Sequence, residues 1–359
     1  LYIKCHTVHL FSVQMAQPNR VQTLVDSGLA AVPPQYIQPP DHRAGGLRHD
    51  AAAPPIAVPV IDLDPQSGDP ILDIRRACKD WGAFQVINHG VPISLLEEMK
   101  RVGLAFFQSP TEAKLGYACN PRFPASEGYG SKMLSKDGGV LDWRDYFDHH
   151  TFPESRRNPN RWPDNPDNYR HVVGEYSNSM KALAQKLLSM ISISLGLAPS
   201  YIEDVIGEVY QNITISYYPP CPQPELALGL QAHSDIGAIS LLIQDDVGGL
   251  EVLKDGEWVL VQPLSDAIIV LLSDQTEIIT NGEYTSAEHR ALVNAKQARL
   301  SVATFYDPSK TRVISPAAEL ITDRSPQKYC SVVYGDYLSS WYGKGPDGKR
   351  NLDAILIHQ

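Results

Sequence analysis

The sequence lacks the cysteine pattern that staples small secreted proteins or binds zinc through thiolates. It has only five cysteines in 359 residues, an odd number, widely dispersed and nowhere spaced as Cys-x-x-Cys. Such cysteines disfavour both a disulfide framework and a thiolate zinc site. They fit a reducing environment, and we therefore expect a cytoplasmic protein.

Basic clusters and long apolar runs are also absent from the sequence. The chain carries 31 Lys and Arg against 41 Asp and Glu, a formal net charge of −10. No Lys/Arg cluster is long enough to follow a phosphate backbone. The longest strongly apolar stretch, residues 267–272, is far shorter than the roughly 20 residues that span a bilayer. We therefore expect neither nucleic acid nor a membrane as a partner.

Changes in composition divide the chain into six expected regions. Residues 1–14 precede Met15 and differ in composition from the rest of the chain, so we expect a non-native upstream segment. Residues 15–57 are expected to form a Pro-rich arm that runs extended across the surface. The other regions are an N-terminal region, bracing helices, a β-rich core and a C-terminal lid or tail, at 58–165, 166–207, 208–310 and 311–359.

Hydrophobic periodicity predicts several helices outside the β-rich core. Apolar residues spaced by three, four and seven indicate helices at 71–81, 92–107, 170–197 and 326–342. The last of these is expected either to close the mouth of a barrel as a lid or to dock without further function. Residues 115–169 are rich in Gly, Pro, Asn and Asp, and we expect an irregular lid or pocket wall there.

From Asn212 onward the hydrophobic period falls to two, which is typical of strands. Many short strands separated by Gly and Pro turns favour a barrel or a double-sheet jelly roll, so the fold class is α+β. The strands of this core are expected at 213–218, 238–243, 250–253, 258–261, 268–272, 284–289 and 300–306, after two earlier strands at 58–63 and 83–88.

Three side chains of the β-rich region form a candidate metal site. His233 and Asp235 stand at i and i+2, so on an extended strand they leave the same face. His289 is expected at the end of another strand. Two histidines and one carboxylate are typical of non-haem Fe(II) oxygenases, because they leave coordination positions free for a co-substrate and O2. His-x-Asp triplets also occur by chance, so this pattern needs a second signal.

Arg299 and Ser301 supply that second signal. They are again at i and i+2 and face one way on a predicted strand. A guanidinium fork beside a hydroxyl suits a carboxylate that is held at two points. The ordinary alternative for Arg299 is a salt bridge at the rim, and the nearby metal set argues against it.

Together these motifs resemble the plant soluble 2-oxoglutarate/Fe(II)-dependent dioxygenases, the group of anthocyanidin and flavonol synthases, flavanone hydroxylases and jasmonate hydroxylases. The His-x-Asp pair, the distal His in Ser-x-x-His-Arg and the following Arg-x-Ser carry the resemblance. So do the segments VPVIDL, WGAFQVINHGVP, YYPPCPQPE and GLQAH, at residues 58–63, 81–92, 217–225 and 229–233. The resemblance covers most of the chain and implies a distorted double-stranded β-helix (jelly-roll) core flanked by α-helices.

The resemblance also implies site residues. Two departures from the family, Ser216 for a common Asn and Ser273 for a common Gly, put only affinity in doubt. Carried over by position, the three metal ligands would be His233, Asp235 and His289. The three residues that bind the distal carboxylate of 2-oxoglutarate would be Tyr218, Arg299 and Ser301. Five positions are candidates to face the substrate: Tyr146, Phe147, Thr214, Phe305 and Asp307. For the aromatic residues among them, packing in the core is the alternative.

Other histidines are given structural interpretations. His89 stands at a strand end and is expected to form structural hydrogen bonds. His149 and His150 are adjacent, so on a strand they point to opposite faces and cannot both bind one metal. One of the two is a candidate for the pocket wall.

The resemblance implies an enzyme, most simply a monomer, that oxidises a small-molecule substrate by hydroxylation or desaturation. It would use Fe(II), 2-oxoglutarate and O2, with ascorbate as reductant, and release succinate and CO2. The expected substrate is a flavonoid or another phenolic of plant secondary metabolism, and a jasmonate or another hormone acid is the alternative. Two other classes stay open: a non-catalytic small-molecule sensor on the same fold, and a zinc hydrolase on a cupin-like barrel.

Overall fold

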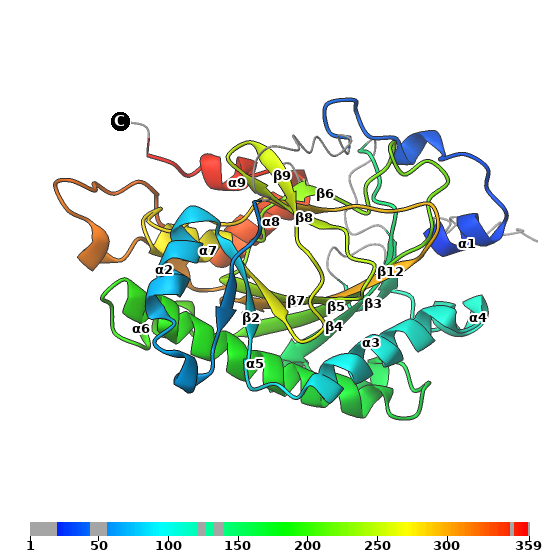
Figure 1. Ribbon diagram of the computed structural model, residues 1–359, viewed down its shortest axis with the longest axis horizontal. Coiled ribbons are helices and arrows are strands. Elements are labelled where there is room, and N and C mark those ends of the chain that lie inside the picture. Colours follow the sequence, from blue (N-terminus) through cyan, green and yellow to red (C-terminus); the bar gives the residue numbers. More distant parts are fainter. Residues whose placement is uncertain (1–19, 44–55, 121–125, 132–138, 345–347, 358–359) are drawn as a thin grey trace, which may run out of the picture.

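The strands form two main sheets, and several long helices lie on the outer side of the larger sheet (Figure 1). The computed structural model describes residues 20–43, 56–120, 126–131, 139–344 and 348–357, so the expectation for residues 1–14 lies outside the described residues. The larger sheet contains, in spatial order, β1 (Val60–Asp62), β2 (Ala83–Ile87), β10 (Ile268–Leu272), β7 (Ile239–Gln244), β12 (Arg299–Asp307), β5 (Tyr210–Tyr218), β4 (Asp145–Phe152) and β3 (Gly128–Gly130).

The smaller sheet completes the predicted jelly roll. Its four strands are β6 (Leu230–His233), β11 (His289–Ala291), β8 (Leu250–Lys254) and β9 (Glu257–Leu260), in that spatial order. A separate pair joins β13 (Val313–Ile314) to β14 (Val332–Val333). The predicted double-stranded β-helix core is confirmed.

Long helices cover the outer face of the larger sheet and explain its apolar strands. Three of them are α2 (Ile71–Asp80), α3 (Ile93–Gln108) and α5 (Tyr169–Ser194). Helix α5 buries one stripe that includes Val173, Met180 and Leu187, as its apolar spacing predicts. All five residues of β10 are buried, as expected for a strand covered on both faces. The helices predicted at 71–81, 92–107 and 170–197 are confirmed.

One glycine lets a helix lie close to the sheet. A Cβ at Gly103 of α3 would come within 3.0 Å of the Ile215 side chain of β5. The absence of that atom brings the helix axis against the strand. Helix α3 therefore supports β5, the strand whose other face lines the cavity of the candidate site.

The prediction of an irregular stretch at 115–169 is wrong in part. Besides the short α4 (Thr111–Leu115) at its start, this stretch contains β3 and the eight-residue β4, which pairs with β5. Its strand pattern is hidden because polar residues of β4 are buried. Asp145, for example, is buried and accepts hydrogen bonds from the backbone N–H groups of Val21 and Gln22. Buried polar groups with such partners mimic a solvent-exposed pattern in the sequence.

The strand predicted at 284–289 is also wrong, because β11 begins only at His289. The preceding residues make their backbone hydrogen bonds outside a ladder: the N–H of Ala287 donates to Leu272, and that of Ser286 donates to the Glu277 carboxylate. Glu277 belongs to the short helix α7 (Asp274–Ile279), which periodicity did not predict.

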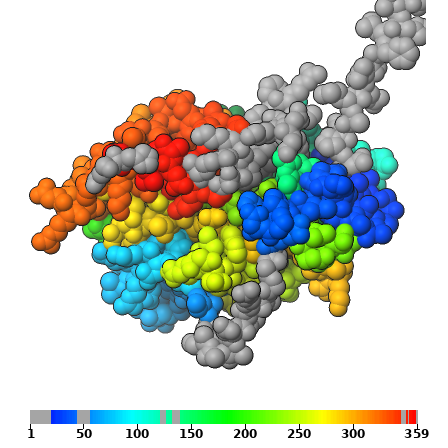
Figure 2. Space-filling model, turned by 90° about the horizontal axis from the view of Figure 1, so that it is seen from above, coloured from blue at the N-terminus to red at the C-terminus, as the bar shows by residue number. Residues whose placement is uncertain are grey.

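The described parts of the N-terminal arm and of the C-terminal region lie on one face of the molecule. Within the expected arm, residues 20–43 form α1 (Val21–Asp26) and a 3-10 turn at Pro34–Tyr36, and they bury Val21, Val32 and Tyr36 beside Trp143. This part is therefore docked and partly helical rather than simply extended. The C-terminal helix begins later than predicted, as α8 (Tyr334–Lys344) followed by α9 (Arg350–Asp353), because β14 pairs with β13 before it. Figure 2 shows both segments on this face.

None of the helices in the described part of the chain has the length and apolarity that a membrane span requires.

Candidate active site

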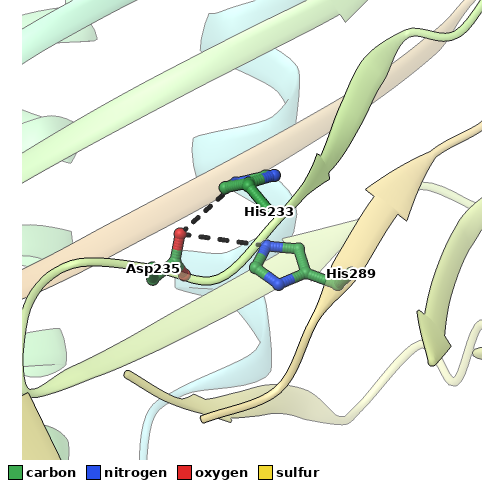
Figure 3. A group of neighbouring side chains, drawn as sticks. All are labelled: His233, Asp235 and His289. Carbon is green, nitrogen blue, oxygen red and sulfur yellow. Dashed lines mark ion pairs between the residues drawn. The ribbon is translucent and has the colours of Figure 1, made fainter. Parts of the chain in front are cut away.

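His233, Asp235 and His289 lie side by side in the structure (Figure 3). His233 ends β6 and is the register partner of His289, the first residue of β11. Asp235 stands in the turn after β6 rather than on the strand itself. Its Oδ1 lies 3.5 Å from Nε2 of His233 and 3.8 Å from Nε2 of His289. One candidate ligand atom from each residue lies within 4.8 Å of the other two, a spacing that suits a shared ion.

The backbone fixes the orientation of both imidazole rings. Nδ1 of His233 lies 2.8 Å from the carbonyl oxygen of Gln231, and Nδ1 of His289 lies 3.0 Å from that of Ala287. A ring that donates through Nδ1 to a carbonyl keeps its lone pair on Nε2. Both lone pairs then face the Asp235 carboxylate. The described residues thus preform three donors for one metal ion.

The charges of the triad suit metal binding. Burial raises the pKa of Asp235, but His289 and His233 lower it more, to about 2. Burial and the neighbouring His233 lower the pKa of His289 to about 4. Burial lowers the pKa of His233 as well, but the contact with Asp235 outweighs it and raises this pKa. At neutral pH the carboxylate is ionised and His289 is neutral, which are the states that bind a cation.

Arg299 presents a buried guanidinium that makes no salt bridge within the described part of the chain, although the Asp245 carboxylate is close enough to interact with it. It is 2% exposed, and neither Nε nor Nη1 has a hydrogen-bond partner among the described residues. Nη2 makes one long contact of 3.4 Å with Gln244, and the guanidinium lies 4.5 Å from the centre of the Tyr218 ring. The Tyr218 hydroxyl is 3.5 Å from Oγ of Ser301. A buried cation whose N–H groups lack hydrogen-bond partners is costly, so these three residues fit the carboxylate of 2-oxoglutarate.

These groups line one cavity of about 1130 Å³. Alternate residues of β5 face into it, and their register partners on β12 face the same way. The pairs run in order along the two strands, from Tyr218 with Arg299, through Ser216 with Ser301, Thr214 with Ala303 and Asn212 with Phe305, to Tyr210 with Asp307. Since strand residues two apart share a face, these five pairs form a continuous surface.

The two ends of this surface carry different charges. The arginine end consists of Tyr218, Arg299 and Ser301, with Arg144, the residue before β4, hydrogen-bonded to Ser216 beside it at 3.2 Å. The aspartate end contains two carboxyls, those of Asp148 and Asp307, with the other lining residues His150, Arg156, Tyr210, Asn212 and Phe305. Helix α8 closes the same region with Tyr334, Leu338, Trp341 and Tyr342.

Both carboxyls of the aspartate end are buried, and burial is the main cause of their raised pKa. The pKa of Asp148 rises to about 7, although its carboxylate accepts a hydrogen bond of 2.9 Å from the Thr214 hydroxyl. The pKa of Asp307 also rises to about 7, first because of burial and then because of Asp235. Arg156 lowers both values but not enough to offset burial. Near neutral pH each carboxyl therefore exchanges between its acid and its anion.

The candidate substrate positions do not all reach the cavity. Thr214, Phe305 and Asp307 line it, whereas Tyr146 and Phe147 are not among its lining residues. Phe147 is fully buried in the core, with its ring centre 5.0 Å from that of Phe106. The ring of Tyr146 lies over Gly130, its register partner on β3, where a side chain would collide with it. Both aromatics thus follow the packing alternative.

The histidine interpretations can be compared with the structure in the same way. His150 lines the cavity, while His149 is buried and contacts the Ile213 carbonyl at 2.9 Å and the Tyr169 hydroxyl at 3.0 Å. His89 lies 3.1 Å from the Asp266 carbonyl and accepts a hydrogen bond from the N–H of Val91. These are structural contacts, as the sequence indicates for His89.

Sequence reasoning missed Asp148 and Arg144 as cavity residues. A signal for Asp148 was available, since Asp148 and His150 lie two apart on β4 and both line the cavity. That stretch was predicted to be irregular rather than a strand, and Arg144 lies just before β4. The C-terminal helix was predicted either to close the barrel mouth or only to dock, and α8 agrees with the first alternative, since Leu338 and Trp341 line the cavity.

Comparisons with known proteins agree with the fold and the site. A model of the 2OG-Fe(II) oxygenase superfamily matches residues 210–308, and a model described as non-haem dioxygenase in morphine synthesis N-terminal matches residues 58–165. Jasmonate-induced oxygenase 1 of Arabidopsis thaliana is 39% identical over 94% of this chain and 86% of its own length. Oxoglutarate-dependent flavonoid 7-O-demethylase 1 of Ocimum basilicum is 40% identical over 95% of this chain and 91% of its own.

A solved structure is similar over nearly the whole chain. The crystal structure of JOX2 in complex with 2OG, Fe and JA has a TM-score of 0.88 and 36% identity, covering 95% of this chain and 98% of that one. The jelly roll and the His-Asp-His triad define the class as a non-haem iron oxygenase. The chain belongs to the 2OG-Fe(II) oxygenase superfamily, as an Fe(II)- and 2-oxoglutarate-dependent dioxygenase. This membership argues against the sensor and the zinc hydrolase.

Proposed function

We propose that this dioxygenase oxidises a hydroxyl-bearing phenolic molecule, of the flavonoid kind, by hydroxylation or desaturation. The observation that carries this proposal is the aspartate end of the cavity, where two buried carboxyls lie beside aromatic side chains. The proposal has three parts: the residues that hold the metal, those that hold the co-substrate and those that select the substrate.

In this proposal His233, Asp235 and His289 hold Fe(II). When bound, Fe(II) with 2-oxoglutarate and O2 supplies the oxidising power, and 2-oxoglutarate leaves as succinate and CO2. The chain keeps the three donor atoms aimed at one point through the Nδ1 contacts of the two histidines. Ascorbate is expected to keep the iron reduced.

Arg299, Ser301 and Tyr218 would bind the distal carboxylate of 2-oxoglutarate. Nη1, which has no partner in the described part of the chain, and Nη2, which makes only one long contact there, can together donate to the two carboxylate oxygens, and the two hydroxyls can donate to the same group. Asp235 is hydrogen-bonded to Ser240 of β7, whose partner on β12 is Phe305. The proposed metal site therefore lies next to the Phe305 part of this surface, so a substrate bound at the aspartate end would stand beside it.

The aspartate end suits hydroxyl groups better than acids. A phenolic hydroxyl can donate to an ionised Asp148 or Asp307 and accept from the protonated form of either one. A substrate carboxylate would face these two buried acids in a region of low dielectric, where like charges are unfavourable. The Phe305 ring and the aromatic residues of α8 offer packing surfaces for a planar ring. Relatives named for flavonoid chemistry support this reading.

A hormone acid such as a jasmonate is the second candidate. Arg156 lies at the aspartate end, and Lys310 also lines the cavity, so cations are present for a substrate carboxylate. The similarity to JOX2, solved in complex with JA, supports the same candidate. The charge of the bound substrate therefore separates the two candidates.

A substrate panel tests the proposal. Flavonoids, phenylpropanoids and plant hormones would each be incubated with the protein, Fe(II), ascorbate and 2-oxoglutarate, and succinate release would be measured. We expect stimulation by hydroxylated flavonoids, and loss of all 2-oxoglutarate consumption in Asp235→Ala. Stimulation by hormone acids alone would favour the second candidate, while restoration of activity by zinc but not iron would contradict the metal assignment. A monomeric state, a cytoplasmic location and the absence of nucleic-acid partners remain predictions.

A further inference from the structure

Helix α7 holds the turn that carries Asp235. The first N–H groups at its N-terminus donate to carbonyls of that turn: Ser273 to Ala238 at 3.3 Å, Asp274 to Asp235 at 2.8 Å and Gln275 to Gly237 at 2.9 Å. Helix N-termini have N–H groups free for such contacts. Because Asp235 stands beyond the end of β6, its position depends on α7 rather than on a β-ladder.

The side chain of Asp274 joins three segments that are far apart in sequence. Its Oδ1 accepts from the Ser286 hydroxyl at 2.9 Å, and its Oδ2 accepts from the Tyr337 hydroxyl at 2.6 Å. Ser234, between His233 and Asp235, also donates to this carboxylate. Asp274 is 1% exposed, so these hydroxyls take the place of water around it.

Glu277, one helical turn further on, binds the same segments. Its Oε2 accepts from the backbone N–H of Ser286 and from Lys349, while its Oε1 accepts from the Tyr329 hydroxyl at 2.6 Å. Residues three apart on a helix share a face. Helix α7 thus presents two carboxylates, both directed at the segment before His289 and at the C-terminal part of the chain.

Helix α8 uses different faces for these contacts and for the cavity. Tyr337 reaches Asp274, whereas Leu338, Trp341 and Tyr342 line the cavity at its aspartate end. The position of this cavity wall is therefore tied to the same carboxylate that holds Ser234 and Ser286.

We propose that Asp274 is a positioning residue that ties the docking of α8 to the placement of Asp235 and His289. The proposal rests on the proposed role of these two residues as metal ligands. Both segments that Asp274 holds, 234–238 and 284–288, lie outside regular strands or helices. Their hydroxyl contacts to Asp274 consequently contribute to where the ligand atoms stand. Substrates that pack on α8 act on the metal site through the Tyr337 contact.

Cobalt(II) binding to the whole protein without O2 tests this inference. Visible absorption bands report the affinity and coordination of Co(II), and hydrogen–deuterium exchange reports the stability of α8. We expect Tyr337→Phe to speed exchange in α8 and to weaken Co(II) binding about tenfold, because loss of an outer contact to a metal site typically costs 10- to 100-fold in affinity. Ser286→Ala should weaken Co(II) binding by a similar factor.

Two further variants separate positioning from general stability. Tyr169→Phe removes an equally buried tyrosine hydroxyl, which contacts His149 at 3.0 Å away from the metal segments, and it should leave Co(II) affinity unchanged. The side chain of Asp274→Asn keeps an oxygen that accepts hydrogen bonds and has an amide group that can donate to a hydroxyl. This variant should therefore retain most of the Co(II) affinity that Asp274→Ala loses.

The inference is overturned if Tyr337→Phe loosens α8 but binds Co(II) as tightly as Tyr169→Phe does. It is also overturned if Asp274→Asn is as weak as Asp274→Ala. If the parent protein does not bind Co(II), the proposed metal site fails instead, so the two failures are distinguishable.

Discussion

The two ends of the cavity use charge in opposite ways. At the arginine end, the buried Arg299 guanidinium has two nitrogens without partners among the described residues and lies beside the Tyr218 ring and two hydroxyls, with Arg144 nearby. At the aspartate end, two buried carboxyls with pKa values near 7 lie close to Arg156. A fixed cation suits one constant dianionic co-substrate, whereas groups that can gain or lose a proton suit a neutral molecule with several hydroxyls. In the proposed function, co-substrate binding belongs to the arginine end and substrate selection to the aspartate end.

Removing the Arg299 guanidinium from the arginine end should have the largest effect. Arg299→Ala is expected to raise the KM for 2-oxoglutarate by about 100-fold or more, since truncating one partner of a buried charge pair costs about 2–5 kcal/mol. Arg299→Lys should recover part of this loss, because an ammonium keeps the charge but not the planar fork. Succinate release as a function of 2-oxoglutarate concentration measures both variants.

Arg156→Ala is the matched control for this comparison, since it removes a guanidinium from the aspartate end. Its KM for 2-oxoglutarate should stay within about twofold of the parent value, a difference below 0.5 kcal/mol. If Arg156→Ala and Arg299→Ala raise the KM for 2-oxoglutarate equally, the two ends do not have the separate binding roles proposed for them.

Changing one carboxyl of the aspartate end should alter substrate preference rather than co-substrate affinity. Asp148→Asn is expected to shift the ratio of kcat/KM for hydroxylated flavonoids to that for hormone acids about tenfold toward the acids, a change of ~1.4 kcal/mol. The reason is that a neutral amide no longer repels a substrate carboxylate. Competition assays with one flavonoid and jasmonic acid measure this ratio.

Asp41→Asn provides the same change of charge at the rim of the same cavity, where the carboxylate is 78% exposed. Solvent screens an exposed charge, so the ratio should barely move. If Asp41→Asn and Asp148→Asn shift preference alike, the effect comes from overall charge and the buried carboxyl has no special role.

The arginine end was largely predictable from sequence, whereas the aspartate end was not. Arg299 and Ser301 stand two apart on a strand, so local spacing alone shows that they share a face. The triad was predicted for a similar reason, although Asp235 lies beyond its strand and His289 begins rather than ends one. A prediction drawn from a short spacing between chemically distinctive residues stays correct even when the strand boundaries are predicted wrongly.

Phe305 and Asp307 of the aspartate end were predicted, but the rest of this end depends largely on tertiary contacts. Asp148 belongs to a strand whose inward side chains are polar, so hydrophobic alternation does not reveal it. Tyr146 lies two residues earlier on the same face, but its ring packs over Gly130 of the neighbouring strand instead of lining the cavity. Gly130 has no side chain that would collide with this ring. The docking of α8 depends on Asp274, some sixty residues before it in the chain. Each of these outcomes is decided by tertiary packing.

The smallest expected effect concerns stability and pH at the aspartate end. In the folded protein the pKa of Asp148 is about 7, while in the unfolded chain it takes the ordinary value of 3.8. The folded state therefore binds a proton that the unfolded state has lost between these two values. The resulting stability is fully present below pH 3.8 and is lost as the pH rises through 7.

Asparagine has no such proton, so Asp148→Asn should gain stability over the parent as the pH rises from 5 to 8. A gain of ~1 kcal/mol corresponds to roughly 2 °C in Tm, which thermal unfolding at several pH values can measure. The Tm difference between Asp41→Asn and the parent should stay flat over the same range. A Tm difference for Asp148→Asn that is constant with pH would show that this carboxyl stays ionised throughout. The aspartate end would then bind hydroxyl groups through a permanent anion rather than through a carboxyl that exchanges its proton.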